Sequence, residues 1–177
     1  WYYHNITSRH EGTMFHAPVV ICSEADSGKT WAVTQMLYTI ANTIIRDTGG
    51  TGPDHAVPLL IPAQRLALIA HKKGNFQNLI QNYIVETFAN DGDVATMLLA
   101  AFNMGSVYLI IDGIDEAGKL SRALEVYVLR KLVMRGYTVT FTARPHGLRL
   151  NYLWDYQFGY RFCHIRPLDE HEQRQLI

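Results

Sequence analysis

The chain has little of what marks several large classes of protein. Among its 177 residues only two are cysteines, which argues against a disulfide-rich secreted scaffold. No run of the sequence approaches the roughly 20 apolar residues that cross a bilayer. Sixteen Lys and Arg residues balance sixteen Asp and Glu residues, so no global field attracts nucleic acid or anionic lipid. We therefore expect a soluble, cytoplasmic protein without a membrane span or a nucleic-acid partner, in which Cys22 and Cys163 are both reduced and buried.

The length predicts one domain with a sizeable core. Residues 1–16 are polar and aromatic without a sustained period, and we interpret them as an approach segment to a core at 17–177. The chain begins with Trp1 rather than Met, and residues 169–177 look like a helix that stops before any cap. We expect a piece of a longer protein, truncated within this domain at the C-terminus.

Apolar runs alternate with segments of helical period along the core. The runs predict strands at 17–22, 57–61, 107–111, 137–142 and 160–165. Helical spacing predicts helices at 28–44, 64–71, 75–88, 94–104 and 120–134. In the first helix the apolar residues that recur at helical spacing are Trp31, Val33, Met36, Leu37, Ile40, Ala41 and Ile44. Pro58 makes its strand an edge strand, because proline cannot donate to a central ladder. This alternation favours an α/β fold with a doubly wound parallel sheet, which binds ligands at the carboxyl ends of its strands.

A short polar segment between the first strand and the first helix has the composition of a phosphate-binding loop. Small residues that tolerate positive φ turn main-chain N–H groups inward, and the helix N-terminus favours an anion. Lys29 is expected to reach the β- and γ-phosphates, and the Thr30 hydroxyl to bind Mg²⁺. The candidate nucleotide-binding residues are Ser23, Glu24, Ala25, Asp26, Ser27, Gly28, Lys29 and Thr30.

Two positions depart from the usual loop. Ser23 stands where a glycine is usual, and Asp26 adds a carboxylate that opposes a polyphosphate. The alternative for the segment is an ordinary strand-to-helix turn with a capping serine and an exposed lysine. That alternative leaves the acidic end of a later strand unexplained.

The apolar run 107–111 leads directly into Asp112, which puts a carboxylate at the rim of the sheet. Mg²⁺ that bridges two phosphates takes oxygen ligands at such a place. Gly113 leaves room, and Asp115 and Glu116 add two carboxylates. We expect Glu116 to orient an attacking water and Asp115 to tune the metal shell. The alternative is a solvated acidic turn.

Arg144 follows the strand expected at 137–142, immediately before Pro145. A guanidinium at this strand end could touch the γ-phosphate and distinguish ATP from ADP. The alternative is an arginine that pairs with surface acids.

Together these segments resemble the phosphate loop (Walker A), the Mg²⁺ strand (Walker B) and the sensor arginine of NACHT domains, in the STAND class of P-loop NTPases. The small residue Gly113 directly after Asp112, followed by a further acidic pair, separates NACHT domains from most other P-loop groups. Residues 165–172 are similar to the last core strand of the family and the acidic helix start after it. The resemblance spans residues 18–177.

The resemblance implies a P-loop NTPase three-layer sandwich with a sheet in the order 5-1-4-3-2. It further implies a nucleotide switch of a signalling or innate-defence protein, with ATP or ADP and Mg²⁺ as cofactors and weak ATPase activity. ADP would hold a closed form, and ATP would favour oligomerisation through this domain. The effector and sensor domains of such proteins lie outside these residues.

Alternatives remain open at this point. Ser23 and Asp26 are compatible with a scaffold that binds nucleotide without hydrolysing it. Another P-loop enzyme, such as a kinase, is less favoured because no arginine-rich lid segment is visible and the pair Asp115 and Glu116 suits water activation better. No base-reading motif separates ATP from GTP.

Overall fold

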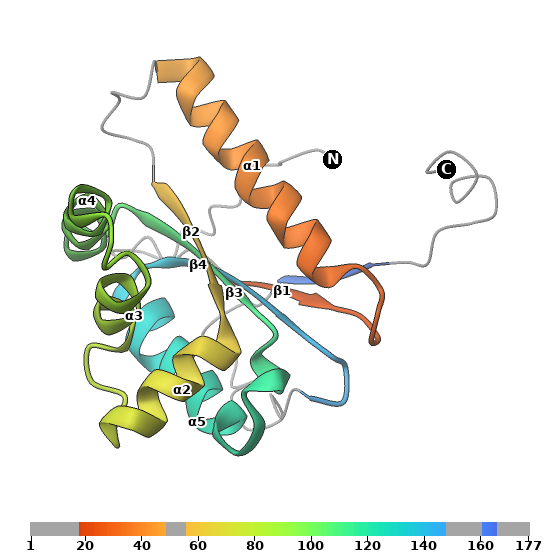
Figure 1. Ribbon diagram of the computed structural model, residues 1–177. Helices are drawn as coiled ribbons and strands as arrows, with labels where there is room; N and C mark the ends of the chain where they lie inside the picture. Colours follow the sequence, from red (N-terminus) through yellow and green to blue (C-terminus); the bar gives the residue numbers. More distant parts are fainter. Residues whose placement is uncertain (1–17, 49–55, 148–160, 166–177) are drawn as a thin grey trace.

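The computed structural model describes residues 18–48, 56–147 and 161–165 (Figure 1). The expected approach segment 1–16, the glycine-rich loop near residue 50 and the expected final helix at 169–177 lie outside these residues.

The five strands form one parallel sheet in the order β2-β3-β4-β1-β5. This is the expected order 5-1-4-3-2 counted from the other edge, and it is confirmed. The strands are β1 (Val19–Cys22), β2 (Val57–Pro62), β3 (Val107–Asp112), β4 (Thr138–Ala143) and β5 (Arg161–His164). β2, which contains Pro58, is an edge strand, as predicted.

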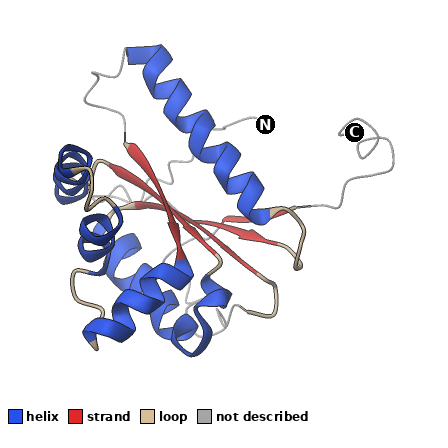
Figure 2. Cartoon of the chain, in the orientation of Figure 1, coloured by secondary structure: helices blue, strands red, loops and turns tan. Residues whose placement is uncertain are grey.

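The helices fall where the periodicity predicts them, with different ends (Figure 2). They are α1 (Lys29–Thr48), α2 (Ala63–Lys73), α3 (Leu79–Thr87), α4 (Gly92–Asn103) and α5 (Ser121–Tyr127). A short 3-10 helix, η1 (Ile114–Leu120), precedes α5. After α5 the chain continues as a π-helical stretch, η2 (Val128–Leu132), and one 3-10 turn, η3 (Val133–Arg135). The helix expected at 120–134 is therefore present, but its second half has π-helical and then 3-10 geometry.

The predicted start of the third helix, at residue 75, is wrong. The Asn75 side chain accepts a hydrogen bond from the Gln77 N–H at 2.9 Å, which closes a local turn. Asn78 then has a left-handed φ of 49°. Polar side chains that bond the main chain locally compete with helix formation, so α3 begins four residues later, at Leu79.

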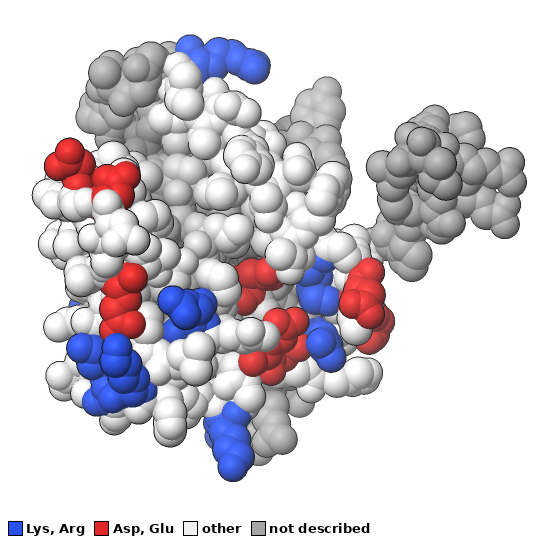
Figure 3. Space-filling view, viewed as in Figure 1, with Lys and Arg blue, Asp and Glu red and all other residues white. Residues whose placement is uncertain are grey.

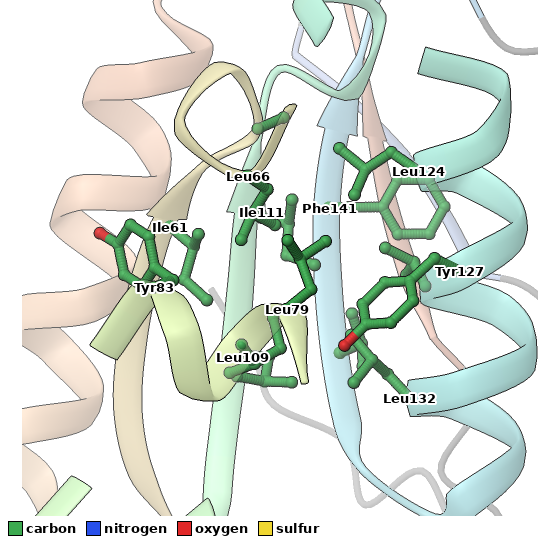
Figure 4. Packing of buried hydrophobic residues seen from close by; sticks show 14 of the residues in the cluster. Ile61, Leu66, Leu79, Tyr83, Leu109, Ile111, Leu124, Tyr127, Leu132 and Phe141 are labelled. Carbon is green, nitrogen blue, oxygen red and sulfur yellow. The ribbon is translucent and has the colours of Figure 1, made fainter. Parts of the chain in front are cut away.

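The sheet lies between two helical layers (Figure 1). α1 covers one face, over β2 and β3, and the helices from α2 to α5 cover the other. The hydrophobic core fills the second interface, where alternate residues of each central strand face the helices (Figure 4). Ile61, Leu109, Ile111 and Phe141 are each fully buried there. This core fixes the positions at which the strands end.

The layer made by α1 is thin and nearly uncharged. Val33 is fully buried, whereas Trp31 is 67% exposed, although both are among the apolar residues at helical spacing. Trp31 lies in the first turn of α1 and points to solvent. Figure 3 shows this face as a broad area almost without charged side chains.

Among the described residues, no helix combines the length and the apolarity of a membrane span.

The two cysteines differ in environment. Cys22 lies buried in β1, whereas Cys163 is exposed in β5, and both are free thiols. The prediction of two buried cysteines is thus wrong for Cys163, because β5 is an edge strand whose apolar residues are not covered on both sides.

Candidate functional site

The loop between β1 and α1 folds tightly on itself. Asp26 and Gly28 have left-handed φ angles of 56° and 83°, a conformation that glycine adopts freely and aspartate tolerates better than most residues. The Ser27 hydroxyl donates to the Glu24 carbonyl at 2.7 Å, and it also contacts the hydroxyl of the buried Ser23. Ser23 therefore helps to close the loop.

Lys29, the first residue of α1, is buried beneath this loop and only 9% exposed. Its Nζ donates to the Ser23 carbonyl at 2.8 Å and also to the Glu24 carbonyl. The alternative of an ordinary turn with an exposed lysine is therefore contradicted. It also lies 3.5 Å from the Ser27 hydroxyl, so its recorded hydrogen-bond partners are all neutral. An ammonium with neutral partners is well placed to attract a stronger, anionic acceptor.

Glu24, Ala25 and Asp26 are exposed on the outside of the same loop. The first N–H groups of a helix have no partner within the helix, so the start of α1 presents donors beside Lys29. The loop thus joins main-chain donors and a buried cation at one strand end.

The second half of the predicted site lies beside the first. Thr30 Oγ1 donates to Asp112 Oδ2 at 2.7 Å, although the two residues are far apart in the sequence. Thr142 Oγ1, at the end of β4, donates to Asp112 Oδ1 at 2.5 Å and accepts from the Gly113 N–H at 2.7 Å. Both oxygens of Asp112 are therefore oriented by hydroxyl groups, one from each flanking element.

Asp115 and Arg144 form a clamp across the ends of β3 and β4. Asp115 Oδ1 accepts from the Arg144 main-chain N–H at 3.1 Å, and Oδ2 lies 3.2 Å from Arg144 Nε. Gly147 closes over this pair, since a Cβ added there would lie 2.4 Å from Asp115 Cβ. The alternative that Arg144 pairs with nearby acids thus describes its contacts here. A γ-phosphate contact for Arg144, and an effect of Asp115 on a metal shell, stay predictions.

Glu116 lies on the other side of this clamp. Its Oε1 is 3.9 Å from Arg144 Nη2, and its Oε2 accepts from Gln64 Nε2 at 3.0 Å. Gln64 belongs to the first turn of α2, directly after β2. Figure 3 shows side chains of both charges gathered over the strand ends, in contrast to the uncharged face over α1.

The Cys22 thiol lies at the base of the site, one residue before the loop. Its burial raises its pKa, the nearby Asp115 carboxylate raises it further, and Lys29 acts in the opposite direction. The thiol is therefore a protonated, inert part of the structure rather than a nucleophile.

Three residues of the site were not identified from the sequence: Gln64, Thr142 and Gly147. A buried threonine at the end of a strand that precedes Arg144 is the kind of signal that could have pointed to Thr142, since a hydroxyl there needs a partner. Gln64 and Gly147 carry no local signal, because their role depends on which loops meet in space.

The donor set suits Mg²⁺ with a nucleotide better than a metal held by protein alone. Among the residues that the structure describes, no three His, Cys, Asp or Glu side chains gather into a metal-binding group. The oxygens of Thr30 and Asp112 are hard ligands of the kind Mg²⁺ prefers, and phosphate and water would have to supply the rest.

The chain was also compared with known proteins. No protein-family model matches it, and the search of curated proteins returns no significant match.

Proposed function

We propose that this chain is a P-loop nucleotide-binding module of the NACHT type, which binds ATP or ADP with Mg²⁺ and acts as a slow hydrolytic switch in a cytoplasmic signalling protein. The proposal rests on two contacts that occur together in the structure. The Lys29 ammonium lies under the loop 23–28, and the Thr30 hydroxyl meets Asp112 across the strand ends. An ordinary turn would require neither contact.

Each residue has a role in this proposal. Lys29 and the N-terminus of α1 hold the phosphates, and Thr30 and Asp112 hold Mg²⁺. The metal supplies charge neutralisation on the phosphate oxygens. Glu116 orients the water, and Arg144, now held by Asp115, is the group we assign to sensing the γ-phosphate. Exchange of ADP for ATP would then favour self-association of the full-length protein.

The test is calorimetric titration of the purified chain with Mg²⁺-ATP, Mg²⁺-ADP and Mg²⁺-GTP. We expect binding that is lost in Lys29→Ala and made insensitive to Mg²⁺ in Asp112→Ala. Lys72→Ala is the matched control, because it removes the same charge from a surface ion pair between α2 and α3. A folded wild-type chain that binds no nucleotide, or a Lys29→Ala chain that binds as tightly as wild type, would refute the proposal.

A second candidate is a scaffold that binds nucleotide without hydrolysing it. The observation that favours it is the Asp26 carboxylate, exposed on the loop at the phosphate site. Asp26→Asn keeps the shape and the tolerance of left-handed φ but removes the charge, so we expect several-fold tighter binding of Mg²⁺-ATP. Phosphate release that disappears in Glu116→Gln would reject the scaffold.

A further inference from the structure

Glu116 links the ends of three neighbouring strands. One carboxylate oxygen faces Gln64, which follows β2, and the other faces Arg144, which follows β4. The side chain folds back over Gly113, so that a Cβ added to that glycine would lie 3.0 Å from Glu116 Cδ. The carboxylate is thereby held against the strand end that also carries Asp112.

The core fixes the main chain at Gln64, although the Gln64 side chain is exposed. It lies between Ala63 and Leu66, two residues of α2 that are fully buried. β2 ends at Pro62, which is in register with Asp112 of β3. The main chain that carries Gln64 is therefore anchored beside the strand end from which Glu116 departs.

The contact of Gln64 with Glu116 differs in its chemistry from the ion pairs that Arg144 makes. A carboxylate offers about four acceptor sites on its two oxygens, and the glutamine amide uses one of them without adding a charge. Glu116 is 42% exposed and would otherwise exchange between rotamers. A neutral donor can thus fix its orientation while an oxygen remains free to accept from water.

We infer that Gln64 is a positioning residue that holds the Glu116 carboxylate in the orientation needed to activate water. This inference rests on the proposed function, in which Glu116 is the water-orienting group. Gln64 touches neither nucleotide nor metal in this role and acts only through Glu116.

The test compares Gln64→Ala and Gln64→Glu with Gln35→Ala, which makes the same change at an exposed position of α1. We expect Gln64→Ala to lower kcat about tenfold, a part of the usual contribution of a general base, with the Kd for Mg²⁺-ATP unchanged. Gln64→Glu should lower kcat at least as much, because it places a second carboxylate against Glu116. Gln35→Ala should match wild type, and in a Glu116→Gln background Gln64→Ala should have no further effect.

A readout without turnover is carbon-13 NMR of the nucleotide-free chain, with labelled glutamate carboxyl groups. The Glu116 resonance is the one missing from Glu116→Gln, and we expect it to move in Gln64→Ala but not in Gln35→Ala. An unmoved resonance with unchanged kcat would overturn the inference. So would a weaker Kd with unchanged kcat, or faster hydrolysis. Failure of the proposed function would be seen separately, as absence of nucleotide binding by the wild-type chain.

Discussion

Thr142 offers the sharpest test of how the site is built. Its side chain is fully buried, and its one hydroxyl donates to Asp112 and accepts from the main-chain N–H of Gly113. Thr142→Val keeps the shape and removes only the hydroxyl. Thr142→Ser keeps the hydroxyl and removes a buried methyl group. The pair therefore separates hydrogen bonding from packing at one position.

The expected cost of Thr142→Val follows from the two bonds. A buried N–H left without an acceptor costs about 1–3 kcal/mol, and a lost bond to a charged group about 1.5–3 kcal/mol. Asp112 is partly accessible and can turn toward water, which recovers some of the second cost. We expect a loss of about 2–4 kcal/mol from the free energy of unfolding for Thr142→Val. For Thr142→Ser the lost methyl group predicts about 1 kcal/mol.

Equilibrium unfolding in urea measures both variants against wild type, with m-values checked for a common unfolded state. The reasoning is refuted if Thr142→Val lies within about 0.5 kcal/mol of wild type, or if Thr142→Ser is the less stable of the two. A second readout is the Mg²⁺ dependence of nucleotide binding, which should weaken in Thr142→Val because Asp112 loses a group that orients it.

Three further predictions concern backbone space, thiols and alkaline stability. Gly147→Ala should lower the midpoint of thermal unfolding, because the added Cβ would clash with the Asp115 side chain. Gly92→Ala should leave the midpoint unchanged, because the space around Gly92 is open. Equal midpoints for the two variants would contradict this prediction. A thiol reagent at pH 8 should modify the exposed Cys163 rapidly and the buried Cys22 only after unfolding, as mass spectrometry can show, and equal rates would contradict the burial of Cys22. Burial raises the pKa of Tyr127 to about 12 from its ordinary value of 10.0. The stability that the neutral Tyr127 side chain contributes is therefore complete below pH 10 and is lost as the pH rises toward 12. In Tyr127→Phe the free energy of unfolding, measured in urea, should fall less steeply over this pH range than in wild type.

Most of the fold could be predicted from the sequence, for a local reason. Runs of buried residues and helical periods are properties of single elements, so the five strands and the main helices were found. The strand order came from the resemblance of three short motifs, not from periodicity. The motifs also marked Lys29 and Thr30, at the start of α1, and Asp112, at the end of β3, and the structure brings Thr30 and Asp112 into contact.

The errors fall where a residue's environment depends on distant elements. An apolar strand gives the same pattern whether it is central or at an edge, so the exposure of Cys163 could not be read from its neighbours. The helical period of α1 includes Trp31, but a period alone does not say which residues are covered, and this helix buries little besides Val33 and Lys29. The contact of Gln64 with Glu116 joins loops from different strands and leaves no mark in either segment.

The strand order also makes the site a late product of folding. β1 pairs with β4 on one side and with β5 on the other, and both of these strands come after β3 in the sequence. Such pairings close long loops and form slowly. A growing chain therefore carries Lys29 and Asp112 long before β4 can enter between β1 and β3 and bring them together. Any ligand that needs both residues will recognise, and stabilise, only the completed sheet.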